Sequence, residues 1–78
     1  MRFSEALAKR IIRLCQERDI SINKLATLSG LPQSTVDSII RGKSRNPRFT
    51  TVKRICEALG ITLDELLTDP MFDEVDWD

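Results

Sequence analysis

The 78-residue chain contains no histidine, only two cysteines, and few glycines, prolines and aromatic residues. Two cysteines without further ligands at suitable spacing cannot complete a zinc site, so we expect no metal and no other cofactor. The chain also lacks a glycine-rich phosphate loop and a nucleophile beside a base, so we do not expect an enzyme. No apolar run approaches the length of a membrane span, and Met1 does not begin a signal peptide, which predicts a cytoplasmic protein with no membrane partner.

The two cysteines, Cys15 and Cys56, both fall on the apolar face of a predicted helix. A disulfide between them is the alternative, but neither lies in the loop framework typical of small secreted domains. We therefore expect buried free thiols that pack as small hydrophobic groups.

The formal net charge of zero hides a complete segregation of charge along the chain. All twelve Lys and Arg lie in residues 1–54, where only four acids oppose them, giving a net charge of +8. Residues 55–78 carry eight acids and no base. Ordinary solvated helix faces are one explanation, but a basic body with an acidic end favours nucleic acid as the partner.

Apolar residues at helical spacing predict five helices and no strand, which places the chain in the all-α class. Ser4 and Ser21 are the expected N-caps of the first two helices, and Thr62 with Glu65 forms a capping box for the fifth. Pro70 is expected to end regular structure. The predicted helices run over about residues 4–18, 21–30, 32–42, 51–59 and 62–68.

The inward-facing residues of these helices define the expected core. Phe49 is included as the side chain that anchors the preceding loop, residues 43–49, to that core. We expect one folded domain, residues 1–69, and then an acidic tail, residues 70–78, whose apolar side chains indicate that it docks on something. The expected core residues are Leu7, Ile11, Leu14, Leu25, Ala26, Val36, Ile39, Phe49, Val52, Ile55, Leu59, Leu63 and Leu66.

Residues 21–42 have the spacing of two short helices that cross at a tight turn. Ala26 is small and permits a close approach of the second helix, Gly30 can take the positive φ that the turn needs, and Val36 fills the angle between the helices. This spacing predicts a helix-turn-helix, a unit that usually places its second helix in the DNA major groove.

Motifs in order along the chain resemble the phage-repressor and Cro-like (XRE) helix-turn-helix domains over about residues 7–67. The matching pattern is Leu25-Ala26 with Gly30, then Val36 and Ile39, followed by Arg-Gly-Lys at 41–43, Pro-Arg-Phe at 47–49 and the closing residues 58–67. The resemblance implies a compact five-helix, lambda-repressor-like fold. It also implies sequence-specific binding to a double-stranded DNA operator, transcriptional regulation by a repressor, and a two-fold homodimer on DNA.

The polar outer face of the third helix is expected to contact base edges. Gln33 can pair with adenine through two hydrogen bonds, and serine hydroxyls can bond to any base. Asp37 could accept from cytosine N4 or form a salt bridge with a neighbouring basic residue, and we favour the structural role. The predicted base-contacting residues are Gln33, Ser34, Asp37 and Ser38.

Phosphate contacts are expected on both sides of that helix, because clustered cations release counterions and free helix N–H groups bind anions. In the family, an arginine at the place of Arg48 reaches the minor groove, which would favour narrow A·T-rich sites. The predicted phosphate or minor-groove residues are Ser21, Asn23, Arg41, Lys43, Arg45, Asn46 and Arg48.

The sequence departs from its relatives at three positions. Many relatives have Gln where this chain has Ile22, so we expect a weaker phosphate clamp. Some relatives bury an arginine and a carboxylate at the positions of Cys15 and Ile40, where we expect a hydrophobic contact instead of an ion pair.

The end of the chain is the expected dimerisation surface. The alternatives are an antitoxin or regulatory protein whose acidic, apolar tail binds another protein, and an activator whose tail contacts polymerase. The predicted interface residues are Asp64, Leu67, Met71, Phe72, Val75 and Trp77.

Overall fold

Helices follow one another throughout residues 1–77, which the computed structural model describes; Asp78, the end of the predicted tail, lies outside the described residues. The predicted all-α class is confirmed, and no strand occurs in residues 1–77. The elements are α1 (Phe3–Glu17), α2 (Ile22–Ser29), α3 (Gln33–Ile40), α4 (Phe49–Leu59), α5 (Leu63–Leu67) and a short 3₁₀ helix, η1 (Pro70–Glu74).

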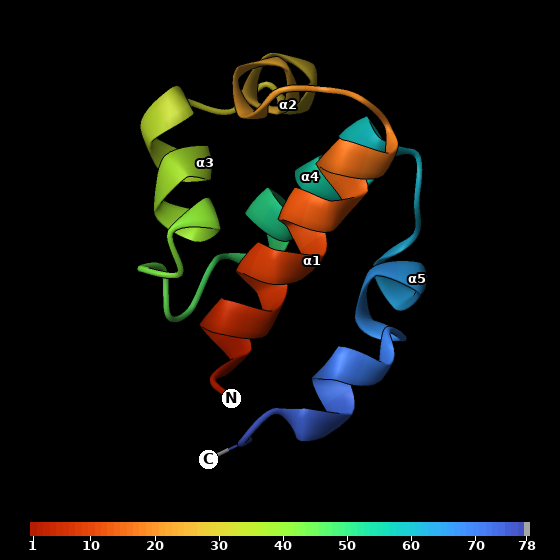
Figure 1. Cartoon of the computed structure of the whole chain (residues 1–78). Coiled ribbons are helices and arrows are strands. Elements are labelled where there is room, and N and C mark those ends of the chain that lie inside the picture. Colours follow the sequence, from red (N-terminus) through yellow and green to blue (C-terminus); the bar gives the residue numbers. More distant parts are fainter. Residues whose placement is uncertain (78) are drawn as a thin grey trace.

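Helix α1 runs through the middle of the molecule and separates the two halves of the chain (Figure 1). Helix α3 lies on one side of α1, and α5 and η1 lie on the other. Helix α2 closes one end of the molecule and packs against both α3 and α4. The N-terminus and the end of the described part of the tail lie at the opposite end from α2, close to the loop that follows α3.

Local sequence signals explain where the helices around the predicted turn begin and end. The Ser21 hydroxyl accepts a hydrogen bond from the Lys24 N–H at 3.0 Å, as expected of an N-cap. Gly30 has a φ of +66°, which lets the Leu31 N–H donate to the Ala26 carbonyl at 3.1 Å and closes α2. These bonds confirm the predicted start and end of the second helix.

The capping box at α5 is also confirmed. The Thr62 hydroxyl accepts from the Glu65 N–H at 3.0 Å, and the Glu65 carboxylate accepts from the Thr62 N–H at 3.0 Å. A helix of only five residues gains little from its own backbone bonds, so these two contacts are a large part of its local stabilisation.

Three predicted helix boundaries are wrong. Helix α1 begins at Phe3 with Arg2 as its N-cap, so Ser4 lies inside the first turn and is only 6% exposed. Helix α3 ends at Ile40, two residues before Gly42. Helix α4 begins at Phe49, because Arg48 already has the extended backbone of an N-cap.

The predicted core is largely confirmed, since eleven of its thirteen residues are buried in one cluster that also includes Cys15 and Cys56. Leu63 is only partly buried against this cluster. Phe49 is 64% exposed, so the prediction that it anchors the loop is wrong. It lies in the first turn of α4, where its side chain faces solvent rather than the other helices. Both cysteines are free and buried, as predicted.

The chain folds its own tail back onto α1. Pro70 opens η1 instead of ending regular structure, because the Asp69 carboxylate caps this turn by accepting from the Met71 N–H at 2.9 Å. Phe72 and Val75 then form a second small cluster with Ala6. This placement corrects the predicted dimer interface at Phe72 and Val75, because side chains covered within one chain offer no surface to a second copy.

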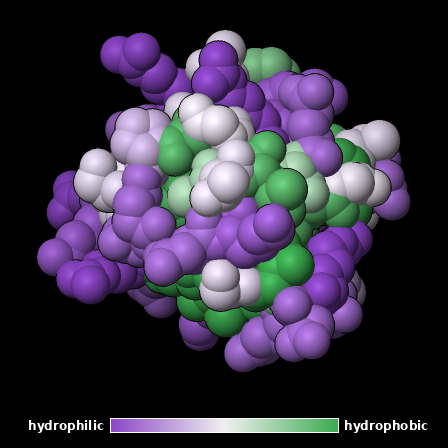
Figure 2. Space-filling model, turned by 90° about the horizontal axis from the view of Figure 1, so that it is seen from above, coloured by the Kyte–Doolittle hydropathy of each residue, from purple (hydrophilic) through white to green (hydrophobic). Residues whose placement is uncertain are grey.

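Polar residues dominate the surface that is seen from the α2 end, with hydrophobic side chains showing between them (Figure 2). Scattered exposure of this kind is usual for folded domains. Within residues 1–77, no helix has both the length and the apolar character that crossing a membrane requires.

Candidate nucleic-acid interface

Helices α2 and α3 form the predicted helix-turn-helix. Ala26 and Val36 are both buried where the two helices meet, and Ile39 continues the buried side of α3. A side chain larger than Ala26 would separate the helices, since a packed core has little space for added volume. The inner side of α3 is therefore fixed, and its polar side is directed outward.

The polar side of α3 carries the residues predicted to contact bases. Gln33 and Ser34 are exposed, while Asp37 and Ser38 are partly exposed. Arg41 is exposed and follows the helix as its C-cap. These positions give the face the access that base contacts require, and the contacts themselves remain predictions.

Gln33 and Asp37 are linked to each other on this face. The Gln33 side-chain Nε2 donates to Asp37 Oδ1 at 3.2 Å, one helical turn along α3. This bond gives Asp37 a structural role, although its partner is an amide rather than the basic residue that we favoured. The second Nε2 hydrogen and the Oε1 atom of Gln33 still have the donor and acceptor that an adenine edge requires.

The segment after α3 carries the densest positive charge next to this helix. Lys43, Arg45 and Arg48 are exposed together with Asn46, and the α3–α4 loop that holds them follows the C-cap directly. Their side chains take part in none of the hydrogen bonds or ion pairs found within residues 1–77. They are therefore available to phosphate groups.

The start of α2 has two predicted phosphate contacts, Ser21 and Asn23, both exposed. The Ser21 oxygen already serves as the helix cap, which leaves its hydroxyl hydrogen for an anion. Ile22, the residue that departs from the relatives, packs against the core instead of facing outward. Ile40 packs against the core cluster that contains Cys15. Both positions therefore have the apolar surroundings that we expected in place of an ion pair.

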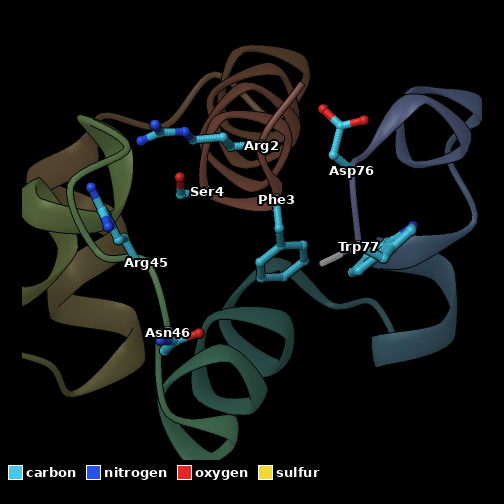
Figure 3. A pocket seen from close by; sticks show the side chains of 7 residues that line it. All are labelled: Arg2, Phe3, Ser4, Arg45, Asn46, Asp76 and Trp77. Atoms are coloured by element: carbon cyan, nitrogen blue, oxygen red, sulfur yellow. The ribbon is translucent and has the colours of Figure 1, made fainter.

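One basic residue that we did not predict for this interface, Arg2, lies beside the α3–α4 loop. Arg2 and Arg45 both line a cavity of about 550 Å³ between the first turn of α1, this loop and the end of the tail. Figure 3 shows both side chains on the same side of Phe3. The two arginines are 43 positions apart, so no local pattern in the sequence could have indicated this proximity.

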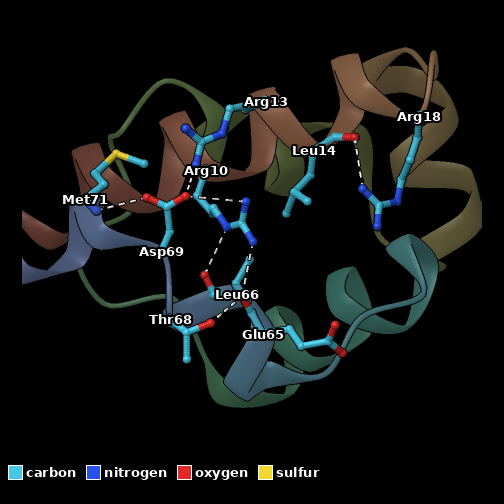
Figure 4. Close-up of polar contacts among 9 residues, drawn as sticks. All are labelled: Arg10, Arg13, Leu14, Arg18, Glu65, Leu66, Thr68, Asp69 and Met71. Atoms are coloured by element: carbon cyan, nitrogen blue, oxygen red, sulfur yellow. Dashed lines mark hydrogen bonds and ion pairs between the residues drawn. The ribbon is translucent and has the colours of Figure 1, made fainter.

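Three other arginines have structural partners (Figure 4). Two of them contact residues on the side of α1 away from α3, and the other is the C-cap of α1. Arg10 donates to the carbonyls of Glu65 and Leu66 at the end of α5. Arg18 donates to the Leu59 carbonyl at 2.8 Å, at the end of α4. Cations at these helix ends satisfy free carbonyls, so they hold the fold together rather than extend the interface.

The third of these arginines, Arg13, pairs with Asp69, which Arg10 also approaches at 3.7 Å. The Met71 N–H bond lowers the pKa of the Asp69 carboxyl, and the neighbouring Arg13 and Arg10 lower it further. Burial raises the pKa of the Cys15 and Cys56 thiols, so both remain protonated at neutral pH.

Comparison with known proteins gives concordant matches. Residues 10–70 match the model of the Cro/C1-type HTH DNA-binding domain. The chain is 33% identical over 63 residues to the HTH-type transcriptional repressor RghR of Bacillus subtilis (strain 168), covering 81% of this chain and 47% of that protein. It is 41% identical over 58 residues to the HTH-type transcriptional regulator SlrR of the same strain, covering 73% of this chain and 38% of that protein.

A solved structure extends the similarity to the whole fold. The crystal structure of the prophage Lp1 protein 11 matches with a TM-score of 0.82 and 34% identity, covering 96% of this chain and 100% of that chain. In contrast, this chain spans less than half the length of the two Bacillus proteins. The shared region is therefore the helix-turn-helix domain.

Proposed function

This chain belongs to the family of Cro/C1-type HTH DNA-binding domains, and from this we propose that it binds double-stranded DNA sequence-specifically and regulates transcription. The family membership confirms the resemblance seen in the sequence. We propose repression by operator occupancy, in which the bound protein excludes polymerase. A location in the cytoplasm, together with the DNA that it binds, accords with this function.

One observation supports the proposal most strongly: the exposed polar face of α3 is followed at once by the exposed cations of the α3–α4 loop. Base edges are read by groups such as the Gln33 amide, while cations beside the helix bind phosphates and fix its register on the duplex. Both requirements are met on one side of the molecule. The acidic η1 segment lies across α1 from α3, so its carboxylates are on the other side of α1 from the proposed reading helix.

We propose that two copies bind a near-palindromic site, with half-sites about one helical turn, or roughly 34 Å, apart. Three apolar residues of the predicted dimer surface remain uncovered. They are Leu67, which is 37% exposed, the partly exposed Met71 and the exposed Trp77. Asp64, in the first turn of α5, is exposed as well.

The alternative function, an antitoxin or regulatory partner that binds a protein through its tail, has less support. Phe72 and Val75 pack against this chain's own α1 and leave only part of the tail's apolar surface for a partner.

A selection from a random pool of duplexes tests the proposed function. We expect enrichment of a two-fold symmetric motif, confirmed by fluorescence anisotropy with the selected duplex in low salt. A matched control is the double variant Arg45→Ala with Arg48→Ala, which keeps the core but removes two loop cations and should bind all duplexes weakly. No affinity of the unmodified chain for any duplex in low salt would refute the proposal.

A further inference from the structure

The cavity that contains Arg2 and Arg45 has the chemistry of a phosphate-binding site. We infer that this cleft binds a DNA backbone phosphate through Arg2 and Arg45, and that residues 72–77 of the tail hold Arg2 in position. This inference rests on the proposed function and adds a contact from the opposite end of the chain. Here "the cleft" means the cavity of about 550 Å³ between the first turn of α1, the α3–α4 loop and the end of the tail.

The polar groups of the cleft are mostly hydrogen-bond donors. Two guanidinium groups, which match the geometry of phosphate oxygens, line it together with the Asn46 amide and the hydroxyl of the nearly buried Ser4. Two guanidinium groups at one cavity repel each other, and an anion between them would relieve that repulsion. The donor set therefore favours phosphate over a neutral ligand.

The position of the cleft identifies DNA as the source of the phosphate. Gly42, two residues after α3, lies close to the first turn of α1: a Cβ atom at this glycine would be 3.8 Å from the Ser4 carbonyl oxygen. The cleft therefore lies beside the C-terminal end of the helix that we propose to read the bases. A duplex backbone that passes this end of α3 would meet Arg45 and Arg2 in turn.

The tail supports the residues on both sides of Arg2. The Asp76 N–H donates to the Met1 carbonyl at 2.9 Å. On the other side, the Phe3 ring packs against Trp77 and Phe72, with ring centroids 5.5 and 6.2 Å away. Chain ends are usually mobile unless they are fixed by such contacts. These contacts reduce the conformational entropy that Arg2 would lose on binding a phosphate.

One acidic group also borders the cleft. The Asp76 carboxylate lies on the opposite side of Phe3 from Arg45 (Figure 3), and its Oδ2 atom is 3.3 Å from the Met1 nitrogen. The cations and the carboxylate are thus separated across the cleft, which leaves the side next to the loop electropositive.

The first test is the salt dependence of DNA binding by Arg2→Ala. Loss of one phosphate contact should reduce the slope of log K against log salt by about 0.9 and weaken binding about fivefold at 150 mM salt, equally for all duplexes. The matched control is Lys9→Ala, which removes the same charge from an exposed position of α1 outside the cleft. If Arg2→Ala and Lys9→Ala have the same slope as the unmodified chain, the cleft does not bind DNA.

The second test separates the role of the tail from a general loss of stability. Trp77 is 66% exposed, so Trp77→Ala should fold, which thermal unfolding can verify. We measure binding to a duplex with a single half-site, where dimer contacts at Trp77 do not contribute. On this duplex we expect the variant to weaken DNA binding when Arg2 is present and to have no further effect in the Arg2→Ala background. Equal weakening in both backgrounds would refute the positioning role.

The third test distinguishes a DNA phosphate from a free anion. Trp77 is the only tryptophan of the chain and lines the cleft, so its fluorescence reports on occupancy. We expect a duplex to change its emission, whereas inorganic phosphate at constant ionic strength should not. A saturable response to inorganic phosphate, with DNA affinity unaffected by Arg2→Ala, would make the cleft a free-anion site and overturn the DNA assignment.

These outcomes also separate this inference from the proposed function. If the unmodified chain binds no duplex, the proposed function fails. If it binds a selected duplex with the same affinity and slope as Arg2→Ala, only the cleft assignment fails.

Discussion

The structure separates the exposed cations beside α3, which should contact DNA, from three arginines of α1 and its C-cap that hold the fold together, and this separation predicts the salt dependence of binding. Four exposed cations lie at the end of α3 and in the α3–α4 loop: Arg41, Lys43, Arg45 and Arg48. At about 0.9 per phosphate contact, they should contribute a slope of about 3.6 per bound chain. Arg2 would raise this to about 4.5 if the cleft binds a phosphate as inferred.

The slope of 3.6 corresponds to an affinity loss of about 150-fold per chain between 50 and 200 mM salt. In Arg45→Ala the slope should fall to about 2.7 and the same loss to about 40-fold. The matched control is Arg13→Ala, which removes the same charge but lies beside Asp69, on the side of α1 away from α3. Its slope should equal that of the unmodified chain.

The assay is fluorescence anisotropy of a labelled duplex at several salt concentrations, well below the unfolding temperature of each variant. Two results would refute the reasoning. If Arg13→Ala lowers the slope as much as Arg45→Ala, binding depends on total charge rather than on these positions. If neither variant changes the slope, the loop lies away from the phosphates.

Three further predictions concern base reading, acid stability and helix capping. Gln33→Ala should cost about 1–3 kcal/mol on a matched site and relax the preference at one base pair; an unchanged ratio of matched to mismatched affinity would show that this side chain reads no base. Asp69→Asn should flatten the acid dependence of unfolding: the lowered pKa of Asp69 means that its stabilisation is present above its ordinary pKa of 3.8 and is lost as the pH falls through the lower value of the folded chain. If the unfolding temperatures of the two chains fall in parallel between pH 6 and pH 2, this prediction is contradicted. Thr62→Ala should cost about 1 kcal/mol, seen as a lower midpoint in urea unfolding, whereas Thr62→Ser should retain the cap and the stability; equal losses in both would mean that the hydroxyl does not matter.

The sequence alone determined most of the helices and the inner side of each one. Helical periodicity and capping residues are local signals, so the caps at Ser21 and Thr62 and nearly all of the core could be predicted from them. The exposed face of α3 followed from the same periodicity, because fixing the buried side of a helix also fixes the opposite side.

The tertiary structure decided the features that depend on residues far apart in the chain. Phe72 and Val75 were known to be apolar, but only the folded chain shows that α1 covers them, since the sequence cannot distinguish burial within a chain from burial between chains. Likewise, Arg10 and Arg18 look like Arg45 in sequence, and their distinct roles depend on which helix ends lie within reach. The proximity of Arg2 to Arg45 arises in the same way, because a cleft between distant segments exists only after the helices have packed.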